Sequence, residues 1–154
     1  MLGGEINYVG LEGTVWWEAR PRSIFGTVES RSASTQPSIA EMVAVASVGV
    51  GFLHNLAAAE ALVSRFDLNE LGKAREEALT VGLDGRIGRT SIRGFAAEGL
   101  KIIRRGLQAA GEDEHYVDLL EERLRNGNPA QRSIEIFNDG GIEGILEAYR
   151  LRRS

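Results

Sequence analysis

The 154-residue sequence contains no cysteine, which excludes disulfide frameworks, thiolate zinc sites and cysteine nucleophiles. This absence is compatible with a reducing compartment, and we predict a cytoplasmic location. The sequence also lacks an excess of basic residues, because its formal net charge is −4. A large nucleic-acid-binding surface is therefore not expected.

The N-terminal residues lack the basic region and the apolar core of a signal peptide. Between Glu41 and Glu60 the chain carries no formal charge, and residues 42–53 are strongly apolar. This stretch is only marginally long enough to cross a bilayer, and His54 and Asn55 interrupt it. We therefore predict a buried central helix over about residues 39–64 and no membrane partner.

Length and composition suit a globular domain with its own core, with 43% hydrophobic and 26% charged residues. We predict a single domain over residues 1–154, with a sheet portion at 1–37 and a helical portion at 38–154. The predicted fold class is α+β, in which a small antiparallel sheet of about three strands packs against a bundle of five or six helices.

Three segments in the sheet portion have strand character, at residues 5–9, 14–20 and 25–32. Pro21 is expected to end the second strand, because proline has no N–H to donate. The short spacing favours an antiparallel hairpin of the second and third strands. Because side chains alternate along a strand, Glu29 and Arg31 point to one face, where Arg20 can join them.

Helical character begins after Pro37. Ser38 and Glu41 have the spacing of a capping box at the start of the apolar helix. Gly49 and Gly51 lower its helix propensity, and we expect them to permit close approach of a neighbouring backbone. Glycine and proline positions predict further helices at about 67–80, 91–110, 114–125, from 129 to a break at 138–141, and 142–151.

The most informative chemistry lies in residues 26–37. A carboxylate can hold a divalent cation, and a guanidinium can bind a phosphate or a carboxylate through two parallel hydrogen bonds. Glu29 and Arg31 therefore suit an enzyme that activates a carboxylate with ATP. The same two residues also suit an ordinary salt-bridged surface strand, so the residue pattern leaves both interpretations open.

Four segments in the same order resemble the C-terminal part of the type 2 glutamate–cysteine ligase, or carboxylate–amine ligase, family. Trp-Trp-Glu-Ala-Arg-Pro at 16–21 is similar to a Trp-Trp-Asp-x-Arg-Pro strand of that family. Thr-Val-Glu-Ser-Arg at 27–31, with Thr-Gln-Pro at 35–37, is similar to its Thr-Val-Glu-x-Arg strand and Asp-Thr-Gln turn. The Gly-Leu-Asp turn at 82–84 falls in register, and residues 125–132 resemble its Asn-Gly-x-Gly-Ala-x-Arg segment.

The resemblance implies a partial glutamine-synthetase-like core and a role for each matching residue. Glu29 is implied as a ligand of Mg²⁺ or Mn²⁺ that acts with ATP. Arg20 and Arg31 are implied as catalytic groups that bind the transferred phosphate, and Arg132 as a further phosphate- or substrate-binding group. These types of residue suit the chemistry, because charge collects on phosphate oxygens during phosphoryl transfer.

The chain departs from the family pattern in three respects. Ser34 replaces an aspartate, Thr80 replaces an arginine, and the resemblance covers only the C-terminal portion of a family protein. The Glu-x-Glu strand that supplies other metal ligands would precede residue 1. We therefore expect the C-terminal component of an ATP-dependent carboxylate–amine ligase that needs an N-terminal half or partner subunit. The alternative is a non-catalytic module, a homo-oligomer that associates through exposed strands.

Overall fold

The computed structural model describes residues 19–30, 33 and 36–150. The chain divides into two compact units, Met1–Thr35 and Gln36–Ser154. Within the described residues there are six α-helices and two two-stranded antiparallel sheets, so the predicted α+β class is confirmed. The glutamine-synthetase-like core and the single domain over 1–154 remain predictions.

The described part of the first unit is a β-hairpin formed by β1 (Ala19–Arg22), the 3-10 helix η1 (Ser23–Phe25) and β2 (Thr27–Ser30). Arg20 pairs with Glu29 in the register, and Pro21 pairs with Val28. The prediction that Pro21 ends the strand is therefore wrong, because a proline is tolerated in an edge strand. The strand expected at residues 5–9, and residues 14–18 of the next one, lie outside the described residues.

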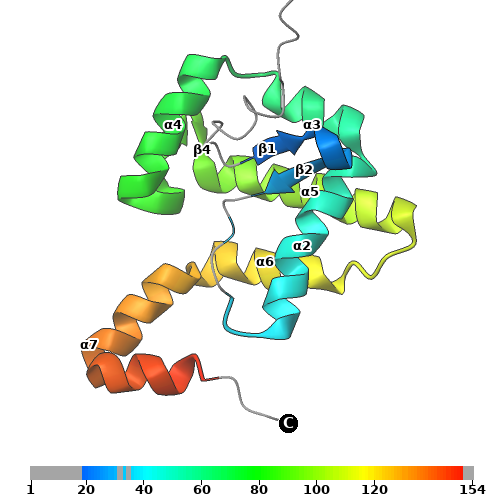
Figure 1. Cartoon of the computed structure of the whole chain (residues 1–154). Helices are drawn as coiled ribbons and strands as arrows, with labels where there is room; N and C mark the ends of the chain where they lie inside the picture. Colours follow the sequence, from blue (N-terminus) through cyan, green and yellow to red (C-terminus); the bar gives the residue numbers. More distant parts are fainter. Residues whose placement is uncertain (1–18, 31–32, 34–35, 151–154) are drawn as a thin grey trace, which may run out of the picture. The chain divides into compact units, whose positions relative to one another are not determined.

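The second unit contains helices, a 3-10 turn and a short hairpin (Figure 1). In chain order these elements are α2 (Ile39–Leu53), α3 (Leu56–Val63), α4 (Leu68–Val81), η2 (Gly82–Asp84), β3 (Arg86–Ile87), β4 (Thr90–Ser91), α5 (Ile92–Ala110), α6 (His115–Asn126) and α7 (Pro129–Ala148). The β3–β4 hairpin has no counterpart in the sequence prediction, because strands of two residues are too short to show alternation.

Local capping explains why most predicted helix ends agree with the structure. Side chains of Asp67, Ser91 and Asn128 accept hydrogen bonds from backbone N–H groups in the first turns of α4, α5 and α7. Gly111 ends α5 in the left-handed conformation. The predicted break in the last helix occurs at Gly141, where φ is 61° and α7 bends sharply (Figure 1).

The apolar segment 39–64 is not one buried helix, contrary to the prediction. It breaks at His54 and Asn55 into α2 and α3, which are bent by 93°. Helix α2 buries one side, which includes Gly51, whereas Leu53 is 72% exposed. No single helix in the described ranges is long and apolar enough to cross a membrane, and only the bent α2–α3 pair meets the length and composition conditions together.

Helices α2 and α5 approach closely at a pair of glycines. A Cβ atom on Gly106 would overlap the carbonyl oxygen of Gly51. The predicted close approach is therefore confirmed at Gly51, but a Cβ on Gly49 would meet nothing within 4 Å. The buried core near this crossing comes from α5 and α6 and consists of Leu100, Ile103, Leu107 and Val117.

Candidate functional site

Arg20 and Glu29 face each other across the β1–β2 hairpin. The Arg20 Nη2 group donates to Glu29 Oε2 at 2.7 Å, and Nε donates to the same oxygen at 3.2 Å. Their direct pairing in the register places both side chains on one face of the hairpin. The structure thus brings together two of the three groups predicted for this face, while Arg31 lies outside the described residues.

The Arg20–Glu29 pair is a charge-assisted contact in which the arginine side chain is largely buried. The Arg20 side chain is 14% exposed and the Glu29 side chain is 39% exposed. A guanidinium held in this way retains Nη1, which has no hydrogen-bond partner within the described residues. The contact to Glu29 therefore leaves one N–H-bearing group of Arg20 for a further oxygen acceptor, the type of atom that phosphates and carboxylates present.

Glu29 supplies one carboxylate for a metal ion but not a whole metal site. Among residues 19–30, 33 and 36–150, no three acidic or histidine side chains lie together in a group that could hold a metal ion. Mg²⁺ is commonly bound by one or two carboxylates together with substrate phosphates and water. The Glu29 carboxylate is therefore suitable as one ligand in a site that other groups complete.

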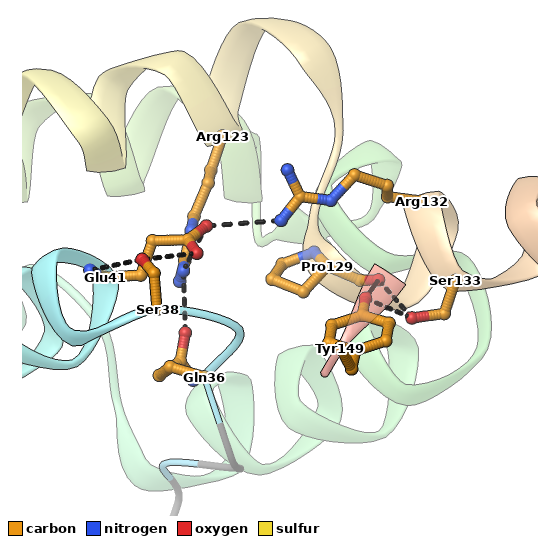
Figure 2. A network of polar contacts seen from close by, with 8 residues as sticks. All are labelled: Gln36, Ser38, Glu41, Arg123, Pro129, Arg132, Ser133 and Tyr149. Carbon is orange, nitrogen blue, oxygen red and sulfur yellow. Dashed lines mark hydrogen bonds and ion pairs between the residues drawn. The ribbon is translucent and has the colours of Figure 1, made fainter. Parts of the chain in front are cut away.

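A second polar cluster joins the start of α2 to α6 and α7 (Figure 2). Glu41 Oε1 lies 3.1 Å from Arg123 Nη2 and 3.2 Å from Arg132 Nη2. The other carboxylate oxygen accepts a hydrogen bond from Ser38 Oγ at 3.0 Å. Arg123 Nη2 also donates to Gln36 Oε1 at 2.6 Å. One carboxylate therefore connects three helices.

The environment of Glu41 favours its ionised form. Burial alone would raise the pKa of this carboxyl group, since the side chain is only 18% exposed. Hydrogen bonds from Arg123, Ser38 and Arg132 stabilise the carboxylate and outweigh burial, so the pKa lies below its ordinary value. Glu41 is therefore a fixed negative charge at neutral pH.

The Glu41 cluster connects two of the motif segments recognised in the sequence. Gln36 belongs to the Thr-Gln-Pro segment, and Arg132 ends the 125–132 segment. Sequence reasoning assigned Glu41 only to a helix cap and gave Arg123 no role, because neither residue occupies a matching motif position. The Ser38–Glu41 spacing was the one sequence signal, and it predicts a cap rather than contacts with distant arginines.

A polar hollow of about 340 Å³ lies beside this cluster, between α2, α6 and α7. Its charged lining residues are Glu41, Glu122, Arg123, Arg132 and Glu135. Arg132, the predicted phosphate-binding residue, has a 53% exposed side chain at this hollow. The described structure therefore places Arg132 where a small ligand can reach it.

The two arms of α7 are fastened by a separate set of hydrogen bonds (Figure 2). Tyr149 Oη lies 2.6 Å from Ser133 Oγ and donates to the Pro129 carbonyl oxygen at 3.3 Å. Ser133 Oγ also donates to that carbonyl at 2.8 Å. These contacts hold the end of α7 against its first turn, the turn from which Arg132 projects.

The helical unit also contains an apolar groove of about 650 Å³. Side chains from α2, α3, α5 and α6 line it, among them Val48, Phe52, Leu62, Phe95, Leu100 and Leu124. Such a lining offers few groups that could orient a charged substrate. We therefore assign the candidate chemistry to the two polar clusters.

Comparisons with known proteins give one match. The family model described as Glutamate-cysteine ligase family 2 (GCS2) matches residues 4–148. No curated protein and no solved structure matches the chain. The matched range includes the Arg20–Glu29 hairpin pair, the Glu41 cluster and all four motif segments.

Proposed function

Because the chain belongs to glutamate-cysteine ligase family 2, we propose that it is the C-terminal component of an ATP-dependent carboxylate–amine ligase. The observation that carries this proposal is the family match, which extends over nearly the whole chain. In such a reaction the γ-phosphate of ATP moves to a carboxylate, and an amine then displaces the phosphate from the acyl phosphate. The substrates are thus ATP, a small carboxylic acid and an amine.

The proposed roles follow from where negative charge develops. Arg20 and Arg31 bind the oxygens of the transferred phosphoryl group, and Arg132 binds a further phosphate or substrate oxygen. Arginine suits these positions because its planar group meets two oxygens at once. In a complete site Glu29 is one ligand of Mg²⁺ or Mn²⁺, which neutralises phosphate charge when bound with ATP.

Activity requires groups beyond those of this chain. Among the predicted site residues Arg20, Glu29, Arg31 and Arg132, Glu29 is the one carboxylate, and it already binds Arg20. We therefore propose that an N-terminal half or a partner subunit contributes the remaining metal ligands and most of the nucleotide pocket.

Co-purification with a chain that carries the Glu-x-Glu strand tests this function. The complex is supplied with ATP, Mg²⁺, glutamate and a panel of amino acids as amines, and ADP is measured. We expect ADP only when the acid and a suitable amine are both present. Arg20→Lys should lower kcat/KM about a hundredfold, whereas the control Arg75→Lys, in an exposed pair with Glu76, should leave it unchanged. A folded complex that forms no ADP would contradict the proposal.

A second candidate is a non-catalytic module that associates through the hairpin. Phe25 and Val28 are 68% and 71% exposed, and a two-stranded hairpin is only marginally stable alone. Among the described residues β1 and β2 pair only with each other, and an edge of this kind can add a strand from another copy. Sedimentation equilibrium should then show a dimer that Val28→Lys weakens. A monomer at every concentration would rule out this candidate.

A further inference from the structure

Arg132 is held at one edge of its guanidinium group. Its Nη2 group donates to Glu41 Oε1 at 3.2 Å, whereas Nη1 and Nε have no partner within the described residues. Figure 2 shows Nη2 directed at Glu41 and Nη1 pointing away from it. The contact to Glu41 thus fixes one side of the Arg132 guanidinium group, and the N–H groups of Nη1 and Nε remain to bind a ligand.

Glu41 is well suited to hold another side chain because it is itself held. Ser38 Oγ binds one carboxylate oxygen, and Arg123 lies against the other. The Glu41 side chain is mostly buried, so it loses little further freedom when it binds Arg132. A flexible surface carboxylate would instead lose its own conformational freedom when it bound Arg132, which would weaken the contact.

Arg132 pairs with Glu41 of another helix although an acidic residue of its own helix is close in sequence. Glu135 lies one helical turn further along α7, at the i,i+3 spacing at which opposite charges ordinarily pair. Both residues line the polar hollow, yet among the described residues Arg132 pairs with Glu41 and not with Glu135. The long-range contact to α2 therefore overrides the local one and sets the direction of the guanidinium group.

We propose that Glu41 is a positioning residue for Arg132. It keeps the guanidinium group away from Glu135 and directs its unused donors to an anionic oxygen group of a ligand, either a phosphate or a carboxylate. The identification of this ligand with a reactant of the ligase rests on the proposed function. The positioning itself depends only on the contacts around Glu41.

A spectroscopic experiment on the isolated chain tests the positioning directly. The chain is labelled with ¹⁵N-arginine, and NMR measures rotation about the Nε–Cζ bond of Arg132, whose signals are identified by their loss in Arg132→Lys. We expect rotation about fivefold slower in the wild type than in Glu41→Gln, as for a half-exposed ion pair. Glu41→Asp should restore part of the difference. Glu122→Gln, which alters an exposed carboxylate of the same hollow, should change nothing.

Titration with inorganic phosphate and, separately, with glutamate identifies the type of anion. The Arg132 Nε signal should shift with at least one of them, and Glu41→Gln should weaken that binding about fivefold. Equal rotation rates of Arg132 in the wild type and in Glu41→Gln would overturn the proposal. It would also be overturned if Glu122→Gln increased the rotation rate as much as Glu41→Gln does. If Glu41→Gln does not fold, the wild type still tests the proposal. In that case, rotation of Arg132 as fast as that of Arg150, whose side chain is 76% exposed, would by itself overturn the proposal.

A kinetic measurement on the complete ligase complex separates this inference from the proposed function. Glu41→Gln should raise KM for the anionic reactant more than it lowers kcat, and Glu41→Asp should recover part of the loss. A complex without ligase activity would refute the proposed function, while the NMR result would still decide whether Glu41 positions Arg132.

Discussion

At the scale of single residues, the two polar clusters differ in how their members meet. Arg20 and Glu29 are opposite each other in a hairpin, so strand alternation and a short turn suffice to predict their contact. Glu41, Arg123 and Arg132 come from three helices. Their contact depends on how those helices pack, and the sequence pattern contains no sign of it.

The Glu41 cluster makes stability depend on pH in a defined direction. The folded-state pKa of Glu41 is lowered, so its contribution is present above the ordinary glutamate pKa and is lost as the pH falls through the folded-state value. We expect Glu41→Gln to lower the free energy of unfolding by about 2 kcal/mol at pH 7. The difference from wild type should shrink below about pH 4.

Urea denaturation at pH 7 and at pH 3.5 measures this dependence. The exposed Glu122→Gln variant is the control, and its unfolding free energy should stay within about 0.5 kcal/mol of the wild type. An equal loss for Glu41→Gln at both pH values would show that the carboxylate charge is not the stabilising feature.

At the scale of elements, the α2–α5 crossing requires one glycine in each helix. Gly106→Ala should destabilise the chain by about 3 kcal/mol, because its methyl group would overlap the Gly51 backbone. Gly49→Ala should instead stabilise it by about 0.5 kcal/mol, since the site is open and alanine favours helix. Thermal or urea unfolding of the two variants gives both values. Similar effects for both substitutions would contradict the observed crossing.

Arg104 of α5 forms ion pairs with three acidic residues at or near the start of α6 and within it, Glu114, Asp118 and Glu121. Arg104 Nη2 donates to Asp118 at 2.6 Å and to Glu121 at 3.1 Å, and its side chain is 27% exposed. We expect Arg104→Gln to lower the free energy of unfolding by about 1 kcal/mol. Arg75→Gln should change it by less than about 0.5 kcal/mol, because the Arg75 side chain is 55% exposed and interactions of exposed charges are weak. Equal urea midpoints for the two variants would contradict this assignment.

At the scale of the whole molecule, the helical unit contains the buried cluster of Leu100, Ile103, Leu107 and Val117. We therefore expect the fragment Gln36–Ser154 to fold without the first unit. Circular dichroism should show a helical spectrum and a cooperative thermal transition for this fragment. A gradual, non-cooperative loss of helix would show that the unit needs further packing partners.

The sequence by itself determined the helix caps, the break at Gly141, the facing of Arg20 and Glu29, and the motif order typical of the family. Capping bonds and strand alternation involve residues a few positions apart, so the local sequence specifies them. Only the tertiary structure decided that the apolar segment bends at His54 and Asn55 and which side of α2 is buried. It also decided that Glu41 meets Arg123 and Arg132. These features depend on which helix surfaces pack together, and side chains distant in sequence become neighbours only through that packing.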